Sequence, residues 1–257
     1  MSSGFQNRHY VSNSCLIHIL MSEFSFGPEV LADAEKLLFI SGIDRDSLKR
    51  IQDHLVVVDA ARKAGVKHIV YTSLAYPERA RFGLEDVHLA TEHAIKAAGI
   101  PYTFLRNTFY TEYYLVPQEL KRAVEKGKLY SLTQGKKINF VSRDDMAKAA
   151  VVVLTSEGHT NKIYEITAPQ AYSYKDIAEI LTEITGKKVE YIEATVEEYS
   201  AYLTEIGVSE EAKRWDSGMR QPGFINGWAE ETDRALADLI GEENIKSPKQ
   251  IIQAMFV

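Results

Sequence analysis

Short apolar runs alternate with segments of helical periodicity between residues 36 and 107. The run over residues 37–40 stops at Ser41 and Gly42, which is typical of a strand buried on both faces of a parallel sheet. A helix is predicted next, begun by Asp44 or Asp46 and ended by Gly65. The apolar residues that recur in it at helical spacing are Leu48, Ile51, Leu55, Val58 and Ala61.

The same pattern repeats further along the chain. It predicts a strand over residues 66–72, a helix over residues 86–98 with Gly99 behind it, and a strand over residues 102–105. This alternation predicts an α/β fold with right-handed crossovers and a doubly wound parallel sheet. Because ligands bind beyond the carboxyl ends of such strands, we expect Ser41, Gly42, residues 72–75 and residues 106–108 to line one crevice.

The first 27 residues follow a different pattern from the rest of the chain. They are mostly polar apart from the run over residues 15–21, which is compatible with one strand, and residues 28–34 allow about two helical turns. Gly4 and Gly27 are the only glycines before Lys36, so no GxxGxxG spacing occurs there. A dinucleotide fold uses that spacing to bring its backbone and a helix N-terminus to a pyrophosphate. We therefore expect the N-terminal part of the sheet to be shortened or altered.

The chain beyond residue 107 predicts a mixture of short strands and capped helices. We expect a helix over residues 112–125 ended by Gly127, strands over 129–132, 139–142 and 162–167, and a buried helix opened by Asp144 and Asp145. Residues 214–227 predict a glycine-rich loop with exposed aromatic side chains. Three capping boxes, each made by a pair of residues three apart, predict the starts of further helices. The pairs are Ser173 with Asp176, Thr195 with Glu198, and Ser247 with Gln250.

Composition narrows the classes of function. The 257 residues carry a formal net charge of −6, and no block of Lys and Arg exceeds a pair, so we expect no nucleic-acid partner. Cys15 is the single cysteine, which excludes an intrachain disulfide and suits a reducing cytoplasm. The apolar run over residues 15–21 is too short to span a bilayer and lacks a charged leader, so we expect no membrane segment and no signal peptide.

Five blocks of sequence resemble one known family. They are KLLFISG (36–42), ARKAGVKHIVYTSL (61–74), HLATEHAIKAAGIPYTFLRNTFYTEYYL (88–115), DDMAKAAVVVL (144–154) and KIYEIT (162–167). In order and separation these blocks resemble the NmrA-like, atypical short-chain dehydrogenase/reductase family, most closely its NAD(P)H:quinone oxidoreductase type 2 branch. The resemblance covers about residues 28–256.

The family resemblance implies an architecture and a function. The fold would be a Rossmann-like cofactor domain over residues 1–155, atypical over 1–35, interleaved with a smaller α+β substrate lobe over residues 156–257. The cofactor would be NADPH or NADH, with NADPH favoured, and the acceptor a quinone or similar small carbonyl compound. The resemblance leaves open whether the protein is a monomer or a homodimer.

Residues of the matching blocks take expected roles from the resemblance. Ser41 and Gly42 would approach the cofactor ribose, Thr72, Ser73 and Leu74 would flank the nicotinamide ribose, and Asn107 would border the nicotinamide. The substrate pocket would be bordered by Phe109, Tyr110 and Tyr113. An alternative is open for Thr72 and Ser73, whose hydroxyl groups are also typical of strand ends that bond their own backbone.

His88 and Glu92 occupy the helical positions where the wider superfamily carries a catalytic Tyr and Lys. Residues four apart share a helical face, so His88 is a candidate proton donor near neutral pH that Glu92 would keep charged. The alternative is an exposed, weakly interacting pair. His93 lies five residues after His88, outside the HExxH spacing, so we expect no metal site.

Aromatic residues after the LRN motif leave two interpretations open. Tyr110, Tyr113 and Tyr114 are suited to stack on a flat quinone or nicotinamide, and equally to pack inside a lobe interface.

Three hypotheses of function follow from the sequence. The first is an active NAD(P)H-dependent quinone reductase. The second is a non-catalytic NmrA-like regulatory protein that senses a nucleotide through the same crevice. The third is a truncated member that binds no cofactor.

Overall fold

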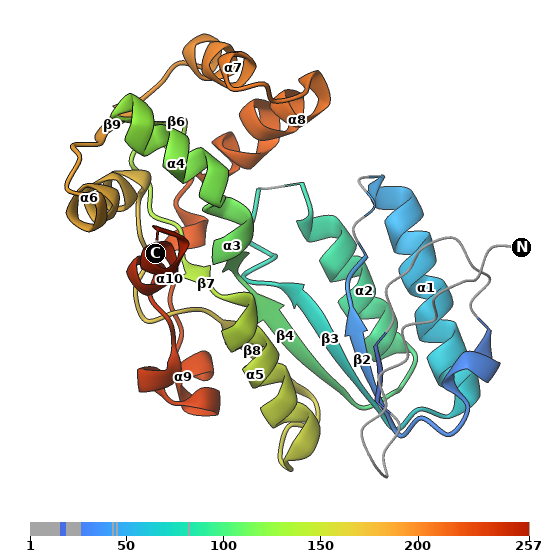
Figure 1. Ribbon diagram of the computed structural model, residues 1–257. Helices are drawn as coiled ribbons and strands as arrows, with labels where there is room; N and C mark the ends of the chain where they lie inside the picture. The colour runs from blue at the N-terminus through green and yellow to red at the C-terminus, as the bar shows by residue number, and fades with distance from the viewer. Residues whose placement is uncertain (1–15, 19–26, 43, 45, 82, 257) are drawn as a thin grey trace, which may run out of the picture. The chain divides into compact units, whose positions relative to one another are not determined.

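One sheet of five strands has the order β1 (Leu16–His18), β2 (Lys36–Ile40), β3 (His68–Leu74), β4 (Tyr102–Asn107) and β8 (Lys162–Ile166) (Figure 1). The computed structural model describes residues 16–18, 27–42, 44, 46–81 and 83–256, so predictions on Gly4, Cys15 and segment 19–26 lie outside the described residues. The chain divides into two units. Unit 1 comprises Met1–Pro77, Leu84–Asn107 and Ala150–Tyr164, and unit 2 comprises Glu78–Gly83, Thr108–Ala149 and Glu165–Val257.

The elements of unit 1 follow the predicted alternation of strands and helices. The described elements are β1 Leu16–His18, a 3-10 helix Pro28–Leu31, β2 Lys36–Ile40, α1 Ser47–Ala64, β3 His68–Leu74, α2 Glu85–Ala97 and β4 Tyr102–Asn107. Helix α5 (Arg143–Thr155) and strand β8 (Lys162–Ile166) each run from one unit into the other along the chain. Neighbours from β1 to β4 pair in parallel, which confirms the predicted Rossmann-like α/β fold.

Local signals placed most boundaries of unit 1 within two residues. Asp46 caps α1 by accepting hydrogen bonds from the amides of Leu48 and Lys49, and Gly65 ends the helix in the left-handed region with φ 74°. The prediction for residues 37–40 was partly wrong, because Leu37 and Phe39 are fully buried while Leu38 and Ile40 are only half-buried. One face of β2 is therefore incompletely covered.

The buried face of α1 agrees only in part with the apolar positions that predicted the helix. Leu48 and Leu55 are 74% and 44% exposed, whereas Arg50 and His54 are 8% and 1% exposed. Both polar side chains bond the turn after β2, which compensates for their burial. The hydrophobic pattern located this helix correctly and predicted its buried Val58 and Ala61, but it missed the burial of Arg50 and His54.

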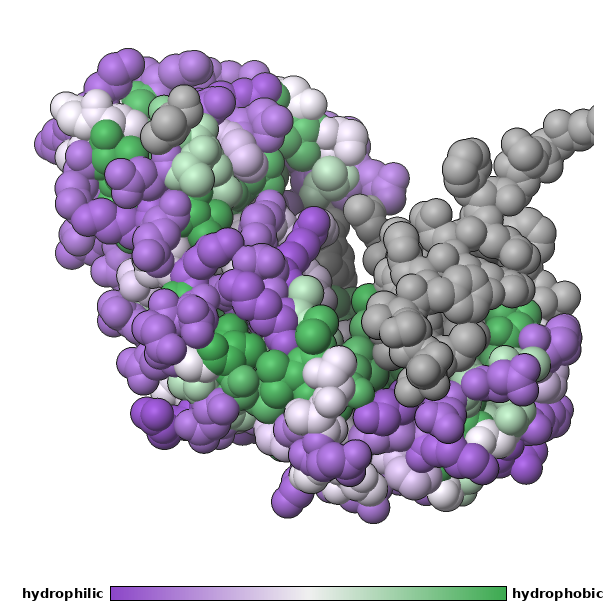
Figure 2. All heavy atoms as spheres, turned by 60° about the horizontal axis from the view of Figure 1, so that its bottom comes forward, coloured by the Kyte–Doolittle hydropathy of each residue, from purple (hydrophilic) through white to green (hydrophobic). Residues whose placement is uncertain are grey.

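The core of unit 1 lies between the sheet and the two helices α1 and α2, which lie side by side (Figure 1). Phe39 and Tyr71 from adjacent strands have ring centroids 5.1 Å apart, and Tyr71 also meets Phe104 at 6.3 Å. These rings are fully buried. In the space-filling view most of the visible surface is hydrophilic, with hydrophobic side chains gathered in smaller patches (Figure 2).

Unit 2 holds short parallel strand pairs among helices. Its elements are β5 Phe109–Tyr110, α3 Thr111–Tyr114, α4 Pro117–Lys126, β6 Lys128–Ser131, β7 Phe140–Val141, α6 Tyr174–Thr185, β9 Glu190–Glu193, α7 Val196–Glu205, α8 Glu210–Trp215, α9 Ala235–Ile240 and α10 Pro248–Phe256. Strand β5 pairs with β7, and β6 pairs with β9. The predicted helix starts at Ser173, Thr195 and Ser247 are all confirmed by reciprocal bonds with Asp176, Glu198 and Gln250.

Two predictions in unit 2 were wrong. The helix predicted over residues 112–125 is interrupted between α3 and α4, because Pro117 begins a new helix and disfavours helical geometry in the residue before it. The loop predicted over residues 214–227 contains the π-helix Asp216–Arg220 and the 3-10 helix Pro222–Phe224. Phe224 is fully buried instead of exposed, so this segment packs as part of unit 2.

Across the described ranges, none of the helices is both long enough and apolar enough to cross a bilayer.

Candidate functional site

The carboxyl ends of β2, β3 and β4 lie next to one another at one edge of unit 1. Ile40 is in register with Thr72, and Leu74 is in register with Asn107. The Ala75 amide donates to the Asn107 carbonyl at 2.9 Å, which holds the last residues of β3 and β4 together. The structure therefore brings the predicted cofactor residues of unit 1 to a common edge.

The turn after β2 is held by three hydrogen bonds, one with β3 and two with α1. The Ser41 amide donates to Thr72 Oγ1 on β3 at 3.1 Å, and the Gly42 amide donates to His54 Nε2 on α1 at 3.0 Å. Arg50 Nη2 donates to Ser41 Oγ at 2.5 Å. The hydroxyl of Thr72 thus bonds the backbone of a neighbouring strand end, so this hydrogen bond differs from the local strand-end bond considered as an alternative.

Ser73 is anchored to a buried ion pair. Its hydroxyl donates to Glu92 Oε1 at 2.6 Å, and Arg106 donates from Nε and Nη2 to the two oxygens of the same carboxylate at 2.9 and 2.8 Å. The side chains of Arg106 and Glu92 are 9% and 2% exposed. This bidentate geometry links α2 to the ends of β3 and β4 and orients Ser73.

His88 and Glu92 do not form the pair that the sequence suggested. Both are buried, which contradicts the alternative of an exposed pair. The Glu92 carboxylate bonds Ser73 and Arg106, while His88 Nδ1 lies 3.0 Å from the Tyr71 hydroxyl. Burial, helped by the charges of Arg50 and His54, holds the pKa of His88 well below its usual value. The hypothesis that Glu92 keeps His88 charged is therefore wrong, and a catalytic role for either residue stays a prediction.

Asn107 carries an unused acceptor at the end of β4. The residue is 7% exposed, and its Oδ1 atom has no hydrogen-bond partner among the described residues. An unsatisfied buried acceptor is costly, so this atom is suited to receive a hydrogen bond from a ligand N–H or O–H group. A nicotinamide carboxamide and a ribose both offer such donors. Asn107 therefore fits the nicotinamide half of a dinucleotide.

The predicted substrate residues belong to unit 2, and they differ from one another in burial and in the side chains that they contact. Phe109 is 4% exposed and packs against Phe224 and Trp228, with ring centroids 4.8 and 5.5 Å away. Tyr110 is half-buried with the Arg143 guanidinium 5.6 Å from its ring centroid, and Tyr113 is 48% exposed. Of the three side chains, those of Tyr110 and Tyr113 are partly accessible to solvent, and contact of any of the three with a substrate stays a prediction.

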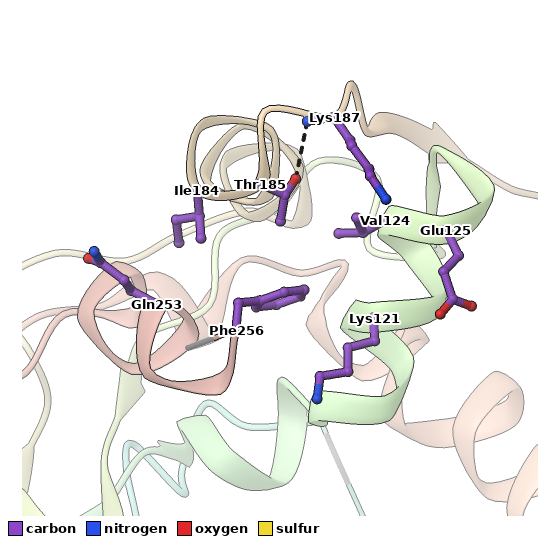
Figure 3. A pocket seen from close by; sticks show the side chains of 8 residues that line it. All are labelled: Lys121, Val124, Glu125, Ile184, Thr185, Lys187, Gln253 and Phe256. Atoms are coloured by element: carbon purple, nitrogen blue, oxygen red, sulfur yellow. Dashed lines mark hydrogen bonds between the residues drawn. The ribbon is translucent and has the colours of Figure 1, made fainter.

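A separate hollow of about 500 Å³ lies in unit 2 (Figure 3). Its walls come from α4, α6 and α10, and its lining residues are Lys121, Val124, Glu125, Ile184, Thr185, Lys187, Gln253 and Phe256. None of these is a predicted site residue, and the hollow is wide open to solvent with exposed lysines at its rim. We assign it no role in the chemistry.

Sequence reasoning missed the residues that support the turn and the strand ends. Arg50, His54, Tyr71 and Thr91 are buried, and the ion pair that Arg106 forms with Glu92 was not expected, although Arg106 itself was predicted at the crevice. A signal existed for two of them, since Arg50 and His54 lie four apart on one face of a helix between otherwise apolar positions. Their partners are distant in the sequence, which is why pattern analysis did not find them.

The family is decided by sequence comparison. The model of the NmrA-like family matches residues 16–214. The chain belongs to the NmrA-like family. This result confirms the resemblance predicted from the five sequence blocks.

Curated NmrA-like relatives include named oxidoreductases. Quinone oxidoreductase 2 of Escherichia coli (strain K12) is 36% identical over 178 residues, which are 69% of this chain and 61% of the relative. NAD(P)H azoreductase of Xenophilus azovorans is 27% identical over 184 residues, covering 71% of this chain and 63% of the relative. The chain thus spans less than two thirds of the length of these relatives.

Solved structures of the family are also similar. Triphenylmethane reductase of Citrobacter sp., complexed with NADP(H), has a TM-score of 0.84 and 37% identity, covering 89% of this chain and 79% of that one. The NADPH-dependent quinone oxidoreductase of Escherichia coli, complexed with NADPH, has a TM-score of 0.81 and 31% identity, covering 90% and 79%. These similarities confirm the predicted fold class.

Proposed function

We propose that this NmrA-like protein is an NAD(P)H-dependent oxidoreductase of the quinone reductase type. The observation that carries the proposal is the buried Asn107 Oδ1, which has no hydrogen-bond donor among the described residues. It lies at the edge formed by the ends of β2, β3 and β4. The acceptor of the reaction is a quinone or a similar small conjugated compound. Similarity to quinone oxidoreductase 2, an azoreductase and a triphenylmethane reductase supports this substrate class.

The residues of unit 1 divide the binding of the cofactor among them. Ser41 and Gly42 approach a ribose, Thr72, Ser73 and Leu74 flank the nicotinamide ribose, and Asn107 accepts a hydrogen bond from the nicotinamide half. The bound nicotinamide supplies the hydride. NADPH is the favoured form, because two similar structures hold NADP(H) or NADPH.

Proton delivery in this proposal comes from solvent. A hydride and a proton together convert a quinone to a hydroquinone, and His88 is buried with its pKa held well below its usual value. A neutral, enclosed imidazole is a poor proton source near neutral pH. We therefore infer that His88 supports Tyr71 and the helix α2 instead of protonating the substrate.

The experiment is a titration of the full chain with NADPH and NADH, followed by nicotinamide fluorescence, and then a panel of quinones with NADPH consumption as the readout. We expect NADPH binding and turnover, and a weaker NADPH affinity in Asn107→Ala. Asn244→Ala, at an exposed position of unit 2, is the matched control. No binding at millimolar cofactor refutes the proposal, and binding without turnover on any quinone favours a regulatory nucleotide sensor instead.

The proposal includes a cytoplasmic location, supported by the single cysteine of the chain. Light scattering coupled to size-exclusion chromatography decides between a monomer and a homodimer, and aggregation in that experiment supports the alternative of a truncated member without cofactor.

A further inference from the structure

A chain of three hydrogen bonds runs from the turn after β2 to the backbone of α2. The Gly42 amide donates to His54 Nε2 at 3.0 Å, His54 Nδ1 lies 2.8 Å from Thr91 Oγ1, and Thr91 Oγ1 donates to the Val87 carbonyl at 2.7 Å. His54 and Thr91 are each 1% exposed. These three hydrogen bonds therefore lie inside unit 1, beneath the turn that the proposed function assigns to the cofactor.

The direction of every bond in this chain is determined by chemistry. A backbone N–H only donates, so His54 Nε2 must be an acceptor without a proton. The proton of the neutral ring is then on Nδ1, and it is donated to Thr91 Oγ1. The Thr91 hydroxyl uses its own proton toward the Val87 carbonyl, which leaves a lone pair free to accept from His54. One neutral tautomer satisfies all three bonds.

The backbone N–H groups of Ser41 and Gly42 are both consumed within the protein. The Ser41 amide bonds Thr72 Oγ1, and the Gly42 amide bonds His54. An anion such as a phosphate is normally bound by free backbone amides at such turns. The backbone of Ser41 and Gly42 therefore offers no donor to a phosphate, and these two residues suit a ligand group that brings its own donors, such as the hydroxyl groups of a ribose.

We propose that His54 is a positioning residue that, as its Nδ1–H tautomer, turns the Gly42 amide into the protein, so that Ser41 and Gly42 suit a ribose instead of a phosphate. The ligand part of this inference rests on the proposed function. The part about His54 and Gly42 rests on unit 1 alone and needs no cofactor to be tested.

The first test measures the tautomer in the unmodified chain. Nitrogen NMR of histidine-labelled protein at neutral pH should show His54 protonated at Nδ1 and unprotonated at Nε2. Exchange of the Gly42 amide hydrogen with solvent should be slow. A ring protonated at Nε2 overturns the proposal, because that proton would face the Gly42 N–H group.

The second test uses two substitutions of His54 that separate the role of Nε2 from the role of Nδ1. The His54→Gln amide reaches the place of Nε2 and keeps an acceptor for Gly42, whereas the shorter His54→Asn amide reaches only the place of Nδ1 and bonds Thr91 alone. We expect Gly42 exchange to accelerate by about tenfold in His54→Asn, corresponding to one lost hydrogen bond, and to stay within about threefold in His54→Gln. The dissociation constant for NADPH should also rise more in His54→Asn than in His54→Gln.

Thr91→Val supplies a further variant that leaves His54 itself unchanged. It removes the acceptor for Nδ1–H while keeping a similar side-chain volume, so we expect the ring to lose its tautomer preference and the Gly42 amide to exchange faster. Equal Gly42 exchange in His54→Gln, His54→Asn and the parent chain overturns the proposal. If the parent chain binds no NADPH, the proposed function fails, while the tautomer and exchange measurements still decide the role of His54.

Discussion

Acidification should destabilise unit 1 well above the pH at which its carboxylates titrate. Burial lowers the pKa of His54 from 6.5 to about 4, with Arg50 adding to the effect and Asp53 opposing it. Burial also lowers the pKa of His68 and of His88. These rings are neutral in the folded protein and gain a proton more readily in the unfolded chain, so acid favours unfolding.

The sign and the size of the effect follow from linkage. A group with a depressed pKa in the folded state contributes stability that is present above its unfolded pKa of 6.5 and is lost as the pH falls toward about 4. One pKa unit corresponds to about 1.4 kcal/mol, so His54 alone accounts for about 3 kcal/mol over that window and about 2 kcal/mol by about pH 5. Asp44, Asp59 and Asp144 have pKa values lowered from 3.8 by lysine or arginine neighbours and remain charged throughout.

The assay is urea unfolding at a series of pH values from about 7.5 to about 5. Amide signals of β3 and β4 should be followed, because two units need not unfold together. His54→Gln is the control, since it keeps the acceptor for Gly42 but does not titrate. The free energy of unfolding of the parent chain should fall relative to the variant by about 2 kcal/mol between the two extremes. Parallel curves for the two proteins would refute the assignment of His54 as a buried neutral ring.

Three further predictions concern stability. Glu92→Gln should cost about 3–5 kcal/mol, because it removes the carboxylate that meets Arg106 through two hydrogen bonds inside unit 1, and the double change with Arg106→Met should recover part of the loss in urea unfolding; additive losses would contradict the ion-pair explanation. Asn139→Ala should cost about 1–3 kcal/mol in the unfolding of unit 2, because the buried amide bonds both the N–H and the carbonyl of Ala168 at 2.8 Å, and an unchanged unfolding midpoint would show that water replaces it. Ser173→Ala should cost about 1 kcal/mol through loss of the α6 cap, with Ser173→Thr as the conservative control, and equal losses in both variants would point away from capping.

Local sequence was sufficient wherever the determining contacts are local. The cap at Asp46, the left-handed glycine at Gly65 and the capping box at Ser173 involve atoms within a few residues of each other, so they are visible in the sequence itself. The alternation of strands and helices likewise predicted the parallel sheet and the adjacent strand ends. The order and separation of the five blocks predicted the family, which the comparison confirmed.

Hydrophobic periodicity failed where polar side chains are buried. His54 and Arg50 would be assigned to the solvent side of α1 by their polarity, yet both face the sheet, and the apolar Leu48 is exposed. Burial of such groups is favourable only when partners satisfy their hydrogen bonds. Those partners come from Ser41 and Gly42 on the turn and Thr91 on α2.

The sequence by itself determined the alternating elements of unit 1, the capped helix starts, the fold class and the family of this protein, because propensity, capping and apolar patterning act over short distances. Only the tertiary structure decided that Glu92 pairs with Arg106 and that His54 holds Gly42. Residues 54 and 91 are separated by 37 positions, and only the packing of α1 beside α2 brings them within hydrogen-bond distance. The tautomer of one ring, and with it the direction of an amide at the candidate site, is therefore a property of the assembled unit.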